Sequence, residues 1–136
     1  MHLYHLTLSP PPCLFQSIAG HFSGSSKSQE ILCASNTHLT LLRADPLSGK
    51  ILTLCVQPLF STVRSLSTFR LPGSVQEYAV VGSDSGRIVV LEYQSSTNKL
   101  VQVHMETFGK TGMRRLVPGQ YLAADPKGRA LMIGIS

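Results

Sequence analysis

The chain has 136 residues, which is enough for one domain, and its 43% hydrophobic and 14% charged content excludes a disordered, charge-rich polypeptide. Twelve Lys and Arg against seven Asp and Glu give a net charge of +5, so contact with an acidic partner or with nucleic acid is permitted. No apolar run reaches the roughly 18 residues of a bilayer-spanning helix, and no basic region precedes the first apolar residues. We therefore expect a soluble, unsecreted chain in which Cys13, Cys33 and Cys55 are reduced thiols.

Strand patterns dominate the chain from one end to the other. Short segments rich in Val, Ile, Leu, Thr and Tyr alternate with clusters of Gly, Pro, Asn, Asp and Ser, and no segment has the apolar period of an amphipathic helix. The pattern predicts an all-β fold. The expected strands are 3–8, 15–22, 29–35, 38–43, 50–56, 63–71, 77–82, 87–93, 99–105, 120–124 and 129–135.

The sequence contains an internal repeat. Residues 22–43 can be laid on residues 69–90 without a gap, at an offset of 47, which places Glu30 on Glu77. Each unit then holds four short antiparallel strands in about 45 residues, the size of a β-propeller blade.

The repeat predicts an incomplete, WD40-like β-propeller of about two and a half blades. Because the chain ends inside an apolar strand, we expect a truncated propeller that is poorly soluble or partly unfolded by itself. The expected blades are about 15–57 and 63–105, with the start of a third at about 119–136.

The stretch VVGSDSGRIVVLEY, residues 80–93, raises the question of a phosphate loop or a serine nucleophile. Phosphate loops need a different glycine spacing and a following helix, and a nucleophile elbow needs Gly-x-Ser-x-Gly before a helix. Neither Ser83 nor Ser85 meets that pattern, and a β-branched run follows. We expect the bend of a hairpin, in which Gly82 and Gly86 take positive φ or permit close backbone approach.

Other motifs for chemistry are weaker still. Gly109-Lys110-Thr111 lacks the first glycine of a phosphate loop, whose position is held by His104. The five histidines are too widely spread for a metal site. We expect no catalytic residue, no cofactor and no metal.

Several stretches carry a resemblance to a known family: HFSGSSKSQEIL, LLRADPLSGKI, VRSLSTFRL, YAVVGSDSGRIVVLEY and ETFGKTGMRRLVPGQYLAADPKGRALMI. They resemble the amino-terminal propeller of the splicing factor 3B subunit 3 family, from Met1 to about Met132. That family belongs to a wider group with the large subunits of cleavage and polyadenylation specificity factor and of damaged-DNA-binding protein.

The resemblance implies a non-enzymatic scaffold in the nucleus, acting in pre-mRNA splicing near branch-site recognition. The implied partners are the HEAT-repeat largest subunit and small accessory subunits of splicing factor 3B, and the U2 small nuclear ribonucleoprotein, with RNA contact indirect or weak and no membrane. The alternative is a nucleic-acid-binding propeller subunit of a related nuclear complex for 3'-end cleavage and polyadenylation or DNA-damage recognition.

Partner contacts are expected in the surface loops, since scaffold proteins bind through the loops that a rigid fold presents. The expected contact residues are Asp84, Arg87, Lys110, Arg114, Arg115, Lys127 and Arg129.

Overall fold

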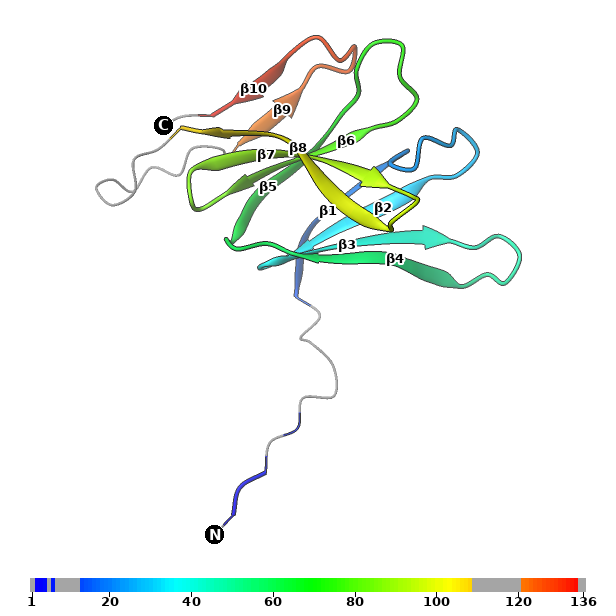
Figure 1. Ribbon diagram of the computed structural model, residues 1–136, viewed down its shortest axis with the longest axis vertical. Helices are drawn as coiled ribbons and strands as arrows, with labels where there is room; N and C mark the ends of the chain where they lie inside the picture. The colour runs from blue at the N-terminus through cyan, green and yellow to red at the C-terminus, as the bar shows by residue number, and fades with distance from the viewer. Residues whose placement is uncertain (1, 5, 7–12, 109–120, 135–136) are drawn as a thin grey trace.

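The computed structural model describes residues 2–4, 6, 13–108 and 121–134, and within these ranges it contains strands and turns but no helix (Figure 1). The prediction of an all-β fold is therefore confirmed. The strands are β1 (Leu14–Gly20), β2 (Glu30–Ser35), β3 (His38–Ala44), β4 (Ile51–Pro58), β5 (Val63–Phe69), β6 (Tyr78–Ser83), β7 (Arg87–Gln94), β8 (Lys99–Thr107), β9 (Leu122–Ala124) and β10 (Leu131–Ile133).

Two four-stranded antiparallel sheets make up most of the fold. The first has the order β1-β2-β3-β4 and the second the order β5-β6-β7-β8, while β9 and β10 pair with each other. Because strand order follows chain order, each sheet is a meander of hairpins, as in a propeller blade. The second sheet lies between the first sheet and the β9–β10 hairpin (Figure 1).

The first strands of the three units lie beside one another. β1 contacts β5, and β5 contacts β9, whereas the outer strands β4 and β8 make a smaller contact. Blades of a propeller meet in this way, with the first strand of each nearest the central axis. The structure therefore places two complete blades and the first two strands of a third side by side.

The core lies between the two four-stranded sheets. On the first sheet Leu32 pairs with Leu41 and Ala34 pairs with Leu39, and all four side chains are fully buried. Alternate residues of a strand point to the same face, so these four side chains face the second sheet together. The second sheet meets them with its own inward residues, Val63, Leu66, Ala79, Val81, Leu91, Tyr93 and Leu100.

The internal repeat holds for β2 and β6, but the ungapped alignment is wrong beyond them. Ala34 and Val81 both face the core, at the predicted offset of 47 (81 minus 34). Across the hairpin Ala34 pairs with Leu39, whereas Val81 pairs with Val89, so that the offset becomes 50 (89 minus 39). Counted between the last paired residues, the bend after β6 (Gly82 to Ile88) therefore encloses five residues, three more than the two enclosed by Ser35 and His38.

The predicted strand at 3–8 is wrong for the residues of it that the structure describes. Leu3, Tyr4 and Leu6 belong to no strand, and they are 92%, 87% and 60% exposed. A strand forms only when a neighbour satisfies its backbone N–H and C=O groups, and the apolar pattern by itself supplies no neighbour.

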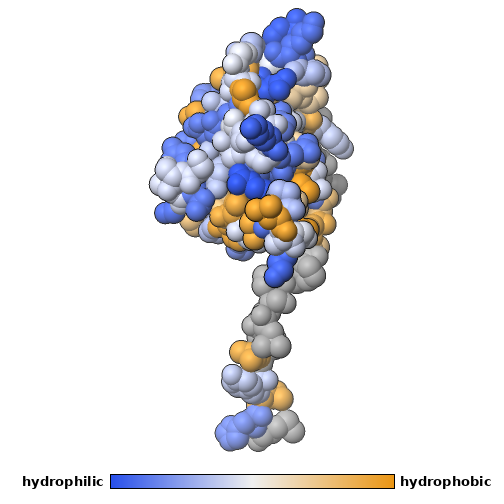
Figure 2. Space-filling model, turned by 90° about the vertical axis from the view of Figure 1, so that its right-hand side faces the viewer, coloured by the Kyte–Doolittle hydropathy of each residue, from blue (hydrophilic) through white to orange (hydrophobic). Residues whose placement is uncertain are grey.

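Apolar side chains remain exposed on the outer strands. Figure 2 shows a face that is largely hydrophilic, with apolar groups gathered along the lower edge of the body. On β4, which forms the edge of the first sheet, Ile51, Leu52 and Val56 are 69%, 46% and 55% exposed. The buried apolar cluster of the described residues thus lies between the two sheets, while the outer strands leave apolar side chains uncovered.

Candidate protein-binding surface

A side-chain amide joins the inner strands of the two blades. Gln16 on β1 donates from Nε2 to the Leu66 carbonyl oxygen over 2.9 Å, and its Oε1 accepts from the Leu66 N–H over 3.0 Å. The amide therefore pairs with β5 as a neighbouring strand would. This link fixes how far apart the two blades lie at their inner edge.

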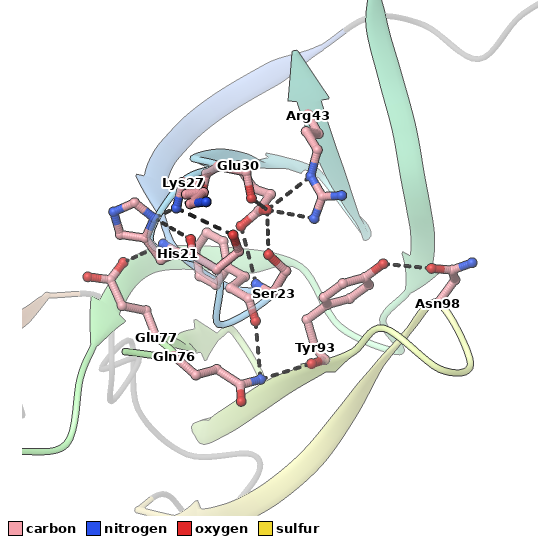
Figure 3. A network of polar contacts seen from close by, with 12 residues as sticks. His21, Ser23, Lys27, Glu30, Arg43, Gln76, Glu77, Tyr93 and Asn98 are labelled. Atoms are coloured by element: carbon pink, nitrogen blue, oxygen red, sulfur yellow. Dashed lines mark hydrogen bonds and ion pairs between the residues drawn. The ribbon is translucent and has the colours of Figure 1, made fainter. Parts of the chain in front are cut away.

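A second polar link joins the blades through the loop after β1 (Figure 3). Gln76 Nε2 donates to the carbonyl oxygens of Phe22 and Tyr93 over 3.1 and 3.0 Å. The neighbouring Glu77 accepts from the His21 N–H over 2.9 Å, and its own N–H donates to the His21 carbonyl oxygen over 3.1 Å. Residues just before β6 thus hold the loop that follows β1.

That loop is also held from within its own blade, by the fully buried carboxylate of Glu30 (Figure 3). Glu30 accepts hydrogen bonds from Ser23 Oγ over 2.7 Å and from Ser28 Oγ over 3.1 Å, and it forms an ion pair of 2.7 Å with Arg43 Nη2. Burial raises the pKa of Glu30, but the hydrogen bonds from Ser23 and Arg43 outweigh it, so its pKa lies below the usual value. These contacts hold the loop against its own blade.

The bend after β6 is the feature that raised the question of a ligand loop and that the sequence predicts to be a hairpin bend. Ser83 Oγ lies 2.7 Å from Ser85 Oγ and donates to the Arg87 carbonyl oxygen over 3.3 Å. Gly86 has φ 73° and donates from its N–H to the Ser83 carbonyl oxygen. The hairpin interpretation is therefore confirmed, and so is the positive φ of Gly86.

Gly82 differs from Gly86. It lies inside β6, pairs with Ile88 and is not among the glycines with positive φ. Of the two alternatives predicted for Gly82, positive φ is therefore wrong, because Gly82 is the last paired residue of β6 and precedes the bend. Close backbone approach at Gly82 stays a prediction.

The linker between the two blades, residues 59–62, is held from both sides by these bends. The Leu59 N–H donates to the Thr37 carbonyl oxygen over 2.7 Å. Asp84 accepts from the Thr62 N–H through Oδ1, and its own N–H donates to the Thr62 carbonyl oxygen, both over 3.0 Å. Asp84 therefore positions the linker as well as lying at the surface.

A groove with a volume of about 350 Å³ opens between this linker and the second sheet. We call it the linker groove and define it by residues 57–61 on one wall and by β6, β7 and β8 on the other. Its sheet wall includes the buried side chains of Leu91 and Leu100 and the more exposed Met105.

Phe60 and Arg87 are among the exposed side chains that line the linker groove. Phe60 lines it and is fully exposed, at 107%. Arg87 lines it too and is exposed, and it forms no ion pair with any residue that the structure describes. Sequence reasoning missed Phe60, although an apolar pair, Leu59-Phe60, between two predicted strands was a signal for it.

The other predicted contact loop is the turn between β9 and β10. Asp125 accepts from Arg129 Nε over 2.6 Å, while Lys127 is exposed. Hydrogen bonds from the side chain of Arg129, and also from the Lys127 N–H, lower the pKa of Asp125. Gly128 has φ 69° and lies so close to the second blade that a methyl group there would overlap the carbonyl oxygen of Arg70.

The structure divides the predicted contact residues between two ends of the second blade. Asp84 bonds to Thr62, just before β5, whereas Gly128 packs on Arg70, just after β5. The 84–87 bend and the 125–129 turn therefore do not form one patch. Lys110, Arg114 and Arg115 lie outside the described residues.

The described residues contain no group of three or more metal-binding side chains, and no helix among them is long and apolar enough to cross a membrane. The three cysteines are unpaired. Burial raises the pKa of the Cys33 and Cys55 thiols, which disfavours the reactive thiolate.

Comparison with known proteins gives one family. The family model described as the RSE1/DDB1/CPSF1 first beta-propeller matches residues 14–136. The chain is 53% identical over 133 residues to pre-mRNA-splicing factor rse1 of Neurospora crassa. It is 54% identical over 134 residues both to splicing factor 3B subunit 3 of Drosophila melanogaster and to spliceosome-associated protein 130 A of Arabidopsis thaliana.

Each of these alignments covers 98% of this chain and 11% of the relative. The chain therefore spans about a tenth of the length of the curated relatives that it matches. The resemblance inferred from the sequence motifs is confirmed, as is the incomplete propeller of about two and a half blades.

Proposed function

Because the chain belongs to the family of the RSE1/DDB1/CPSF1 first beta-propeller, we propose that it is part of a non-enzymatic scaffold in pre-mRNA splicing. The observation that carries the proposal is identity of 53–54% to relatives from a fungus, an insect and a plant that are all named as splicing factors or spliceosome-associated. The place of action that follows is the nucleus.

The proposed partners are other subunits of splicing factor 3B, namely its HEAT-repeat largest subunit and its small accessory subunits, together with the U2 small nuclear ribonucleoprotein. The names of the relatives support a subunit of an assembly. The contact residues proposed from the sequence, including Asp84 and Arg87 at one end of the second blade and Lys127 and Arg129 at the other, then serve two separate surfaces. Each blade is proposed to be one unit of this scaffold: about 15–57, about 63–105 and the start of a third from about 119.

The chemistry of the described side chains supports binding rather than catalysis. The buried carboxylate of Glu30 is neutralised by Arg43, and the two serines of the bend bond to each other and to the backbone. Neither arrangement pairs a nucleophile with a base.

A chimaera tests this function. Residues 14–134 replace the matching segment of Drosophila splicing factor 3B subunit 3, and the chimaera is expressed in cells depleted of the natural protein. We expect it to co-precipitate U2 small nuclear RNA and to restore intron removal. A stable chimaera that accumulates in the cell but brings down no U2 small nuclear RNA would contradict the proposal.

The alternative is a module that binds nucleic acid through the basic residues between 110 and 129. Such binding is carried by phosphate contacts and weakens steeply with salt. Titration of fluorescent RNA at two salt concentrations distinguishes the two functions. Micromolar or weaker affinity that disappears at about 200 mM salt leaves the scaffold function alone.

A further inference from the structure

We propose that the linker groove binds a short peptide segment of a partner protein in which a large apolar side chain lies next to an acidic one. The inference deepens the proposed scaffold role and rests on it, since it names one surface through which the scaffold holds a partner. It also names the chemistry of that partner.

The size and lining of the groove fit one or two side chains. Its volume of about 350 Å³ lies at the lower end of the range for sites that take small ligands. Val89, Leu91, Leu100 and Met105 supply an apolar lining between the sheet and the linker. An apolar side chain that enters the groove is therefore removed from water on several sides.

Phe60 is an exposed aromatic side chain beside the groove. Its ring is fully exposed beside the apolar lining, although Leu59 before it packs against the core. A large aromatic side chain that is left in water is costly, and such residues dominate binding energy at protein interfaces. We expect the ring to cover an apolar side chain seated in the groove.

The positive charge of Arg87 at the groove favours a peptide with a negative side chain. Among the described residues Arg87 is the only charged side chain that lines the groove, and it forms no ion pair with any of them. Asp84, the nearest carboxylate in the sequence, is engaged with the linker backbone. The free guanidinium therefore favours an acidic side chain on the partner.

Protein fits this surface better than nucleic acid does. Nucleic-acid sites line up several cations along the phosphate backbone, whereas the described residues give this groove one. The uncharged polar side chains at the groove include Gln57 and Gln102, whose amides both donate and accept, which suits a peptide backbone. The others are the hydroxyls of Ser61, Ser83 and Ser85.

The test is selection of peptides on the full 136-residue chain. A phage-displayed library of random 12-residue peptides is enriched on the chain, and the enriched peptides are then synthesised with a fluorescent label. Their affinities are measured by fluorescence anisotropy for the natural chain and for Phe60→Ala and Arg87→Glu. Leu47→Ala and Lys99→Glu serve as matched controls, because both residues are exposed and lie outside the groove.

We expect the enriched peptides to combine an apolar residue with Asp or Glu. Their affinity should fall about tenfold or more for Phe60→Ala and roughly threefold for Arg87→Glu. Peptides in which lysine replaces the acidic residue should bind Arg87→Glu better than the natural chain. Proton–nitrogen correlation spectra of each variant show whether it is folded, and a folded variant is required for the comparison.

Three results would overturn the inference. The first is peptides that bind Phe60→Ala and Leu47→Ala alike. The second is a labelled 12-nucleotide uridine RNA that binds more tightly than the peptides and depends on Phe60. The third is self-association of the chain that Phe60→Ala abolishes, since a second copy would then be the occupant. No splicing protein takes part in this test, so its failure is distinct from failure of the chimaera.

Discussion

Gln16 and Leu66 lie 50 residues apart in the chain and are joined by two hydrogen bonds, of 2.9 and 3.0 Å, between one side-chain amide and one backbone unit. The Gln16 amide bonds to Leu66 as the backbone of a neighbouring strand would, because it offers one donor and one acceptor. The pairing of the two inner strands therefore depends on a single side chain at this point.

Replacement of Gln16 by leucine should lower the free energy of unfolding by about 1–3 kcal/mol, since the Leu66 N–H and C=O lose their partners. Urea denaturation followed by circular dichroism measures the change. Gln94→Leu is the control, because Gln94 is exposed at the end of β7 and should be close to neutral. Equal destabilisation by both substitutions would contradict the role given to Gln16.

Glu30→Gln should destabilise the chain by about 1.5–3 kcal/mol at pH 7, because the charged hydrogen bonds from Arg43 and Ser23 are weakened. The pKa of Glu30 is depressed below its usual value of 4.5 in the folded state. Its contribution is therefore complete above that value and is lost as the pH falls through the folded-state pKa.

The difference between Glu30→Gln and the natural chain should thus be constant from about pH 7 to pH 5.5 and narrow below about pH 4.5. Urea midpoints at pH 7, 5.5, 4.5 and 3.5 test this. A difference that widens toward low pH would show that the assigned direction of the pKa is wrong.

Gly128→Ala should release the β9–β10 hairpin from the second blade. The added methyl would overlap the Arg70 carbonyl oxygen, and the residue also keeps φ 69°. Gly49→Ala is the matched control, because Gly49 has φ 66° but nothing within 4 Å of the added atom. Hydrogen exchange of the β9 and β10 amides should accelerate in Gly128→Ala and stay unchanged in Gly49→Ala.

Leu41→Ala should cost about 2–5 kcal/mol, since it opens a cavity in the core between the two blades. Leu47→Ala removes the same atoms from a side chain that is 96% exposed, and it should change stability by less than about 0.5 kcal/mol. Thermal melts of the two variants distinguish the effect of removing a buried side chain from the effect of the Leu→Ala change itself. Similar losses in both variants would mean that the sheets are not packed against each other in solution.

Strands and bends were predictable because their signals are local. The β-branched run after Gly86 identified a hairpin, and the repeat placed β2 over β6 correctly. The longer second bend was missed because the alignment matched residue types, whereas the register is set by which side chains face the core. The same alternating pattern misled at 3–8, where no neighbouring strand is described.

The candidate site was predictable only in part. Asp84 and Arg87 were expected to be at the surface, and both are exposed. The Gln16–Leu66 link and the linker groove arise where segments about 20 to 50 residues apart in the chain meet. Their geometry depends on the packing of one blade on the next, which no local pattern encodes.

The linker between the blades is bonded to the Thr37 carbonyl oxygen on one side and to Asp84 on the other. A segment anchored at both ends keeps its shape when nothing is bound. When a peptide binds to the linker, the loss of conformational entropy therefore falls on the peptide, because the linker is already ordered in the folded chain. Affinity at this surface should accordingly respond more to stiffening of the peptide than to stiffening of the linker backbone.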